Sequence, residues 1–153
     1  SKKIDVTVIS KHWKSVIVIA DYYRIFQVLK NLLSNAIKYS EDNSTIKIQI
    51  EKRKKVVNVS VVDSGIGIPK NDRKRIFERF YRIDKSRSKK KGGTGLGLAI
   101  VKHIIEGHKT KIKLKSKINH GSRFSFNLKL APNKKRKKKS LRKILKKQEV
   151  APL

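Results

Sequence analysis

The chain has 153 residues and carries 41 lysines and arginines against 11 aspartates and glutamates, a net charge of +30. With 37% hydrophobic residues, this length predicts one folded domain with one core and excludes both wholesale disorder and a second full domain. The absence of cysteine excludes disulfides, thiolate metal sites and a cysteine nucleophile. The longest apolar run, residues 16–20, is far shorter than the roughly 20 residues that span a bilayer, so we expect no membrane span. Because the sequence begins with Ser1 and has no signal region, we expect a piece of a longer protein or a processed product.

Basic residues are concentrated at the C-terminus, where residues 134–153 hold ten lysines and arginines and one acid. We therefore predict a folded domain over residues 1–131 and a basic tail over residues 132–153. The tail is either flexible or a short amphipathic helix with an apolar stripe of Leu141, Ile144 and Leu145. Its alternatives are solvated disorder, binding to an anionic surface of lipid or nucleic acid, and a targeting role or artificial extension.

The first predicted elements are two strands over residues 4–9 and 16–19, which we expect to form a hairpin because both are rich in β-branched residues. Asp21 then predicts the N-cap of a long helix that ends near residues 39–40. Its apolar positions recur at spacings of three and four. They are Ile25, Val28, Leu29, Leu32, Leu33, Ala36 and Ile37.

The remaining elements mix strands and helices without regular alternation. Two alternating segments around a basic turn predict a second hairpin, and helices and strands follow. In chain order we predict strands over 45–51 and 56–62, a short helix over 72–77, a helix over 96–106, and strands over 111–116 and 123–130. This order favours an α+β two-layer sandwich over a doubly wound parallel sheet.

The long helix carries a polar stripe of Asn31, Asn35, Lys38 and Tyr39, spaced so that the four side chains lie along one side. Asparagine is a poor helix former, so two on one face lower stability unless their amides have partners. The stripe is either a solvated polar face or a set of neutral oxygens that hold a hydrated Mg²⁺ bound to phosphates.

Two glycine-rich loops follow. In the first, Asp63 ends a strand and can accept a hydrogen bond from an exocyclic amine such as that of adenine, while Gly65 and Gly67 let the backbone approach a flat ring; a tight turn is the alternative. The second loop, residues 92–97, opens a helix, where backbone N–H groups and the helix dipole favour an anion. It matches neither the dinucleotide fingerprint nor a Walker loop.

Four segments together resemble the N, G1, F and G2 boxes of sensor histidine kinases, in order and spacing: residues 31–39, 63–67, 76–82 and 93–100. The resemblance covers residues 3–130. It implies the ATP-binding catalytic domain of the GHKL superfamily, with helices on one face of a mixed, mainly antiparallel sheet.

The resemblance also implies roles for individual residues. Asn35 would ligate Mg²⁺, Asn31 and Lys38 would lie near the phosphates, and Arg82 would reach the γ-phosphate; these four form the catalytic set. Tyr39 would flank the nucleotide, Asp63 would bind the adenine amine, and the hydroxyl of Ser122 would lie near adenine. The residues implied for ATP binding are Asn31, Asn35, Lys38, Tyr39, Asp63, Gly65, Gly67, Ile68, Tyr81, Arg82, Gly93, Thr94, Gly95, Leu96, Gly97, Leu98 and Ser122.

One residue separates the branches of this superfamily. GHKL hydrolases such as gyrase and the heat-shock chaperones have a glutamate general base at the place of Asn31. An amide cannot take a proton from water, so the site is expected to hold ATP for transfer. The alternatives are a GHKL ATPase or serine kinase and a cationic nucleic-acid-binding module, although aromatic residues are not interleaved with the basic runs.

The expected partners lie outside this chain. The resemblance implies a phosphoacceptor histidine on a separate dimerisation domain, a homodimer formed through that domain, a response regulator, and a place at the cytoplasmic face of a membrane-associated kinase. We expect His12, His103, His108 and His120 to be structural or solvated, because none has the family's acceptor context.

Two segments depart from ordinary expectations. Residues 108–111 lack the glycine that the family has after its last helix, so a non-glycine residue is expected to be left-handed there. The predicted lid over residues 83–91 is strongly basic and is either a solvated loop or an added attraction for ATP.

Overall fold

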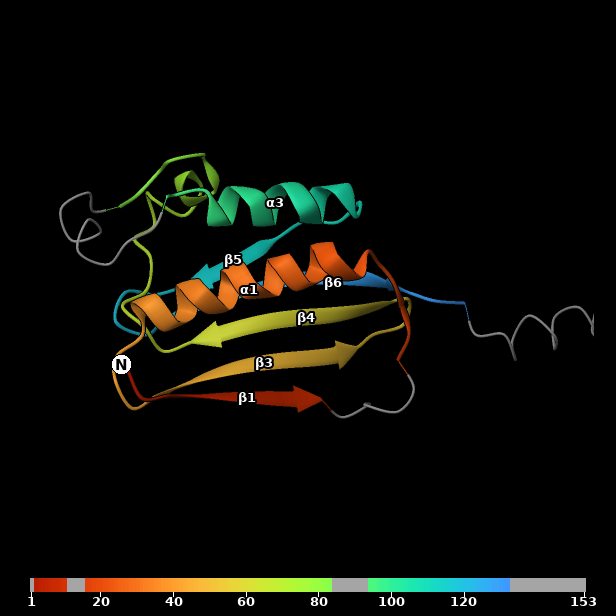
Figure 1. Cartoon of the computed structure of the whole chain (residues 1–153), viewed down its shortest axis with the longest axis horizontal. Helices are drawn as coiled ribbons and strands as arrows, with labels where there is room; N and C mark the ends of the chain where they lie inside the picture. The colour runs from red at the N-terminus through yellow and green to blue at the C-terminus, as the bar shows by residue number, and fades with distance from the viewer. Residues whose placement is uncertain (1, 11–15, 84–93, 133–153) are drawn as a thin grey trace, which may run out of the picture.

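In the computed structural model, which describes residues 2–10, 16–83 and 94–132, six strands form one sheet and two α-helices pack on one of its faces (Figure 1). The strands are β1 (Ile4–Ser10), β2 (Val18–Ile19), β3 (Ser44–Lys52), β4 (Val56–Asp63), β5 (Lys113–Ser116) and β6 (Ser122–Leu130). The helices are α1 (Tyr22–Tyr39), α3 (Gly97–Gly107) and the short 3₁₀ helix η1 (Arg75–Phe77). This arrangement confirms the predicted helices on one face of a mixed, mainly antiparallel sheet.

The sheet is organised around β6. The strand order is β1-β3-β4-β6-β2, with β5 also paired to β6. Strand β6 pairs along its whole length with β4, and its other edge is shared by β5 near Ser122 and by β2 near Leu130. The pair of β1 and β3 is parallel, and the other pairs are antiparallel.

Helix α1 begins as its sequence predicts. The carboxylate of Asp21 accepts a hydrogen bond from the backbone N–H of Arg24 at 3.0 Å, and the helix ends when Ser40 takes an extended conformation. Val28, Leu32 and Ala36, spaced by four residues, are its buried positions. Amphipathic periodicity therefore turns one stripe of α1 toward the sheet.

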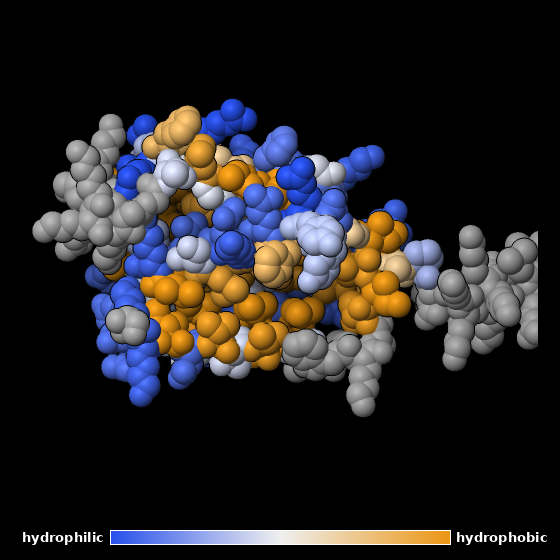
Figure 2. Space-filling model, in the orientation of Figure 1, coloured by the Kyte–Doolittle hydropathy of each residue, from blue (hydrophilic) through white to orange (hydrophobic). Residues whose placement is uncertain are grey.

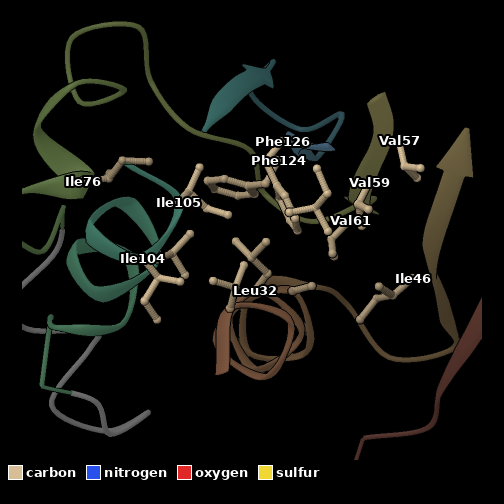
Figure 3. Close-up of a cluster of buried hydrophobic side chains, with 14 residues drawn as sticks. Leu32, Ile46, Val57, Val59, Val61, Ile76, Ile104, Ile105, Phe124 and Phe126 are labelled. Carbon is tan, nitrogen blue, oxygen red and sulfur yellow. The ribbon is translucent and has the colours of Figure 1, made fainter. Parts of the chain in front are cut away.

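The core lies between the two helices and the sheet (Figure 3). Leu32 projects from α1, Ile104 and Ile105 from α3, and Phe124 and Phe126 from β6. The ladder places Phe124 opposite Val61, and alternate residues of β4 and β6 therefore share the inner face. Helices α1 and α3 run antiparallel to one another in Figure 1, and one set of apolar side chains joins them.

The predicted hairpin of residues 4–9 and 16–19 is wrong. Strand β1 pairs with β3 at one edge of the sheet, and β2 pairs with β6 at the opposite edge. The alternating pattern identifies a strand and its faces, but the partner is chosen by the tertiary fold. Strand β2 is also shorter than predicted, and the predicted helix over 72–77 is a single 3₁₀ turn.

The other elements are confirmed with shifted ends. Strands β3 and β4 form the predicted hairpin, and α3, β5 and β6 match the predicted segments within two residues. After α3, Lys109 is left-handed with φ of 56°, which confirms that a non-glycine residue takes this conformation. An L-residue there costs about 1 kcal/mol.

Histidines in the described part of the chain have structural contacts or lie at the surface. His108 Nδ1 lies 2.8 Å from the carbonyl oxygen of Ile104, and His108 Nε2 accepts a hydrogen bond from the N–H of Asp21 at 3.1 Å. This ring joins the end of α3 to the start of α1. His103 and His120 are exposed. His12, most of the predicted lid and the basic tail lie outside the described residues. Among the described helices, none is long and apolar enough to span a membrane.

Candidate functional site

The predicted site residues gather at one end of the molecule, on the left in Figure 1. The C-terminal ends of α1 and β4, the N-terminal end of α3 and the start of β6 meet there. This arrangement brings the polar stripe of α1 and both glycine-rich loops together, although they are up to 66 residues apart in sequence.

Asn31 links α1 to α3. Its amide nitrogen Nδ2 donates to the carbonyl oxygen of Gly97, the first residue of α3, at 3.3 Å. Asn35 lies one turn further along α1 and is half-buried, and its side chain makes no hydrogen bond within the described residues. Lys38 Nζ lies 5.4 Å from the centre of the Tyr39 ring. The polar stripe of α1 therefore runs from the start of α3 to Tyr39, a rise of about 12 Å.

At the Tyr39 end of this stripe, the first glycine-rich loop rests against the backbone of α1. The N–H of Ile66 donates to the carbonyl oxygen of Tyr39 at 3.3 Å. A Cβ on Gly65 would lie 2.4 Å from the same oxygen, so the loop approaches as closely as it does because residue 65 has no side chain.

Asp63 is the half-buried carboxylate of the site. Its Oδ1 accepts hydrogen bonds from the N–H groups of Gly65 at 2.9 Å and Ser122 at 3.1 Å. Burial raises the pKa of Asp63 from its usual value of 3.8, and these two N–H donors oppose that rise. The other carboxylate oxygen, Oδ2, has no hydrogen bond recorded within the described residues. One oxygen is thus fixed, and the other is available to a ligand donor.

The turn between β5 and β6 holds the Asp63 loop in place. Gly121 has φ of +82°, and a Cβ there would lie 1.9 Å from the carbonyl oxygen of Asp63. Ser116 Oγ accepts from the N–H of Ile68 at 2.8 Å and lies 3.0 Å from Ser122 Oγ. Ser122 therefore contributes its N–H to Asp63, while its hydroxyl, predicted near adenine, bonds to Ser116.

Residues 72–82 form a second wall of the site. The hydroxyl of Tyr81 donates to Asp72 Oδ1 at 2.6 Å, and the Arg75 guanidinium lies 4.3 Å from the Tyr81 ring centre. The hydrogen bond to Asp72 raises the pKa of Tyr81. Beside it, Arg82 Nη2 is buried and has no hydrogen-bond partner recorded within residues 2–10, 16–83 and 94–132. A buried guanidinium nitrogen of this kind is suited to an anionic oxygen.

The second glycine-rich loop ends at the start of α3. Thr94 Oγ1 accepts from the N–H of Leu96 at 3.4 Å, and the carbonyl oxygen of Gly95 accepts from the N–H of Phe80 at 3.1 Å. The first N–H groups of any α-helix have no partner within the helix, and in α3 these include the N–H groups of Gly97 and Leu98. The N-cap residue, Leu96, makes no side-chain hydrogen bond to them. Gly93 lies outside the described residues.

The chemistry of these residues fits a magnesium ion that is coordinated partly by the protein and partly by phosphate oxygens. The described residues contain no group of three histidines, cysteines or carboxylates that could hold a metal. Asn35 instead offers one neutral oxygen, and Mg²⁺ is commonly bound by few protein ligands plus phosphate oxygens.

Sequence reasoning missed two residues that hold the site together. Ser116 joins the loop after Asp63 to β6, and Asp72 fixes Tyr81. Ser116 ends an alternating strand and Asp72 lies in a polar turn, so neither had a spacing signal that distinguished it from a surface residue.

The sequence and the fold both match known proteins. Residues 20–132 match the family described as histidine kinase-, DNA gyrase B-, and HSP90-like ATPase. The chain is 45% identical over 111 residues to the sensor-like histidine kinase SenX3 of Mycolicibacterium smegmatis, covering 72% of this chain and 29% of SenX3. It is 44% identical over 110 residues to the sensor histidine kinase WalK of Bacillus subtilis, covering 71% of this chain and 18% of WalK. The chain therefore spans less than a third of either relative.

Solved structures agree with these relatives. The catalytic domain of histidine kinase ThkA superposes with a TM-score of 0.71 at 38% identity, covering 84% of this chain and 82% of that one. Full-length ShkA, solved in complex with AMPPNP, superposes with a TM-score of 0.70 at 29% identity, covering 86% of this chain and 26% of that one. The chain belongs to the family of histidine kinase-, DNA gyrase B- and HSP90-like ATPases, as the ATP-binding catalytic domain found in sensor histidine kinases.

Proposed function

We propose that this domain binds Mg-ATP and presents its γ-phosphoryl group to a histidine on a separate dimerisation domain. The observation that carries the proposal is the arrangement of Asp63, whose Oδ1 is held by two backbone N–H groups while Oδ2 has no hydrogen-bond donor among the described residues. Such a carboxylate is an acceptor for the adenine amine. Gly65 and Gly67 form the backbone floor beside it, and the side chains of Tyr39 and Ile68 flank the base.

The phosphates lie, in this proposal, at the other end of the polar stripe. The N–H groups at the start of α3, which have no partner within the helix, favour negative charge there together with the helix dipole. Arg82 brings a buried guanidinium nitrogen with no hydrogen-bond partner among the described residues, and Lys38, at the Tyr39 end of the stripe, brings a second cation for the phosphates nearer the base. Phosphoryl transfer depends mainly on such positioning and charge neutralisation.

Asn35 would hold the magnesium ion, together with phosphate oxygens. When bound, the ion supplies charge neutralisation on the phosphates. Thr94, Gly95 and Leu96 connect Phe80 to the start of α3, so they close the phosphate side of the site, with Gly93 continuing the predicted loop.

Transfer is favoured over hydrolysis because Asn31 is not a base. Its Nδ2 donates to the carbonyl oxygen of Gly97, so its amide supports the start of α3. A carboxamide cannot accept a proton from an attacking water at neutral pH. A rapid ATPase would need another general base.

The proposal extends to the remaining partners, and the names of the relatives support it. SenX3 and WalK are named as sensor histidine kinases, ShkA was solved with AMPPNP, and this chain covers 29% and 18% of the first two. We therefore assign the acceptor histidine, homodimerisation and response-regulator contact to parts of a kinase outside this chain, at the cytoplasmic face of a membrane. Binding of an anionic surface by residues 132–153 stays a prediction.

Two measurements test the proposal. Calorimetric titration with ATP and Mg²⁺ is expected to show binding that Asp63→Asn weakens at least about ten-fold. Incubation with radiolabelled ATP and the purified dimerisation domain of a related kinase is expected to label that domain, with little phosphate release without it. Rapid hydrolysis by the chain alone would instead identify an ATPase, and binding unaffected by Asp63→Asn would refute the adenine assignment.

A further inference from the structure

The flank of α1 that faces away from α3 borders an open groove of about 900 Å³. Its apolar lining comes from one side of α1, namely Phe26, Leu29, Leu33 and Ile37. Figure 2 shows this region as a continuous hydrophobic band between α1 and β1. Lys38, which is proposed to bind ATP near the phosphates, lines one end of the groove, whereas no residue proposed to contact adenine lines it.

The band is exposed because the sheet is wider than the helices that cover it. Helix α1 packs on β4 and β3. On the edge strand β1, Val6 and Val8 lie opposite Ile46 and Ile48 and therefore point to the same inner face. They are nevertheless 47% and 43% exposed. Contiguous apolar surface of this kind on a soluble domain marks an interaction site.

The α1 side of the groove is equally open. Phe26 is 58% exposed and Ile37 is 42% exposed. Leu29, Leu33 and Ile37 are spaced by four residues and form a straight row about 12 Å long. A row of this length accommodates two to three turns of an amphipathic helix laid along it.

The charges around the groove select the occupant. Its lining includes Lys2, Lys30 and Lys38 and no carboxylate. Lys2 is held at the C-terminal end of α1, where its Nζ donates to the carbonyl oxygens of Ile37 and Lys38 at 3.3 Å each. A second copy of this chain would place lysines against lysines in a symmetric contact, and the basic residues 134–153 would meet the same repulsion.

We propose that the groove along α1, with the exposed apolar band that continues from it toward β1, is a docking surface for an amphipathic helix of a partner protein, with an apolar stripe flanked by glutamates or aspartates. The apolar stripe covers Phe26, Leu33 and Ile37, and the acidic flank faces Lys30. Phe26, Leu33 and Ile37 lie on the opposite flank of α1 from Asn31, and the contact does not use Lys38, which the groove shares with the proposed phosphate site, so docking does not require nucleotide. Its test is therefore independent of the proposed transfer activity.

The test uses the full 153-residue chain and two fluorescent peptides of the same amphipathic leucine pattern. One peptide has glutamates beside the leucines, and the other has lysines at the same positions. Fluorescence anisotropy is expected to detect binding of the glutamate peptide, weakened by salt, and at least about ten-fold weaker binding of the lysine peptide. Equal binding of both peptides, or of neither, overturns the proposal.

Matched variants locate the contact. Phe26→Ala is expected to weaken binding of the glutamate peptide about ten-fold. Ile118→Ala, at a side chain 53% exposed on the β5–β6 turn, is expected to leave binding unchanged. Lys30→Glu is expected to reverse the preference toward the lysine peptide, while Lys102→Glu on α3 does not. Because Phe26 and Lys30 are exposed, these variants should fold. Unchanged binding in Phe26→Ala, or concentration-dependent dimers in sedimentation that the peptide dissociates, would overturn the assignment to a partner protein.

Discussion

Helix α1 has two flanks of opposite chemistry on either side of one buried stripe. Toward α3 it presents Asn31 and Asn35, and toward β1 it presents Leu33 and Ile37. Both flanks depart from what is best for the helix alone, since asparagine is a poor helix former and exposed isoleucine gains nothing in water. The difference teaches that each flank is suited to what it contacts, while the buried stripe between them, with Leu29 and Leu33 packed beside it, stabilises the helix on the sheet.

The largest expected effect comes from a substitution in the buried stripe of α1, on which both flanks depend. Leu32 is 1% exposed at the centre of the core. Leu32→Ala is expected to lower the free energy of unfolding by about 2–5 kcal/mol, because it removes buried methyl groups and leaves a cavity. Urea denaturation measures the loss. Ile37→Ala, at an exposed position of the same helix, is the control, and an equal loss there would show that the groove side is part of the core.

Asp63→Asn tests whether nucleotide binding at one flank of α1 and helix docking at the other are independent. The variant keeps an oxygen for the N–H groups of Gly65 and Ser122 but can place an NH₂ group toward the adenine amine. Affinity for ADP is expected to fall about ten-fold or more, with the anisotropy of the glutamate peptide unchanged. Asp5→Asn on β1 serves as the matched control. A parallel loss of both ligands would mean that the two flanks are coupled.

Lys109→Gly acts on α3 at the end far from the nucleotide site. Because Lys109 has φ of 56°, a glycine there removes the strain of a left-handed L-residue and is expected to raise the free energy of unfolding by about 1 kcal/mol. Thermal unfolding measures the gain, and ADP affinity should not change. A loss of stability would show that the Lys109 side chain contributes more than its backbone conformation costs.

Asn31→Ala distinguishes a functional polar flank from a structural one. The change removes the hydrogen bond to Gly97, worth about 1 kcal/mol, but inserts a better helix former, so stability should change by less than about 0.5 kcal/mol. Nucleotide affinity is expected to fall because the start of α3 is less well positioned. If stability falls steeply while affinity stays the same, the polar flank has a structural role.

The smallest expected effect is on the pH dependence of the free energy of unfolding. Because burial raises the pKa of Asp63 in the folded state, the folded protein retains this proton to higher pH than the unfolded chain does. Its contribution to stability is therefore complete below the unfolded value of 3.8 and is lost as pH rises through the folded pKa. Relative to Asp63→Asn, wild-type stability in urea should decline over this window. A rise relative to the variant would mean that the N–H donors outweigh burial.

Sequence patterns predicted the parts of this molecule that depend on nearby residues. The Asp21 cap, the periodicity of α1 and the β3–β4 hairpin all follow from interactions within one short segment. The partners of β1 and β2 did not follow, because alternation leaves pairing across the sheet undetermined.

The site residues show the same limit. Motif spacing identified Asp63 and Asn31, whose neighbours in sequence carry the signal, and missed Ser116, whose contacts are made only in the fold. Periodicity also grouped Ile37 with the apolar face of α1. It could not show that the sheet leaves this residue 42% exposed, because exposure depends on the position of β1.

The position of β6 also affects how the chain is made. This strand pairs with β4, β5 and β2 and supplies Phe124, Phe126 and Leu128 to the core, yet it is the last in sequence of the strands that the structure describes. During synthesis, which proceeds from the N-terminus, the sheet cannot close until residues 122–130 have left the ribosome. Until then the backbone N–H and C=O groups along one edge of β4 are unpaired, and its apolar face borders an incomplete core. The nascent domain is therefore most exposed to aggregation and to proteases just before its final strand is added.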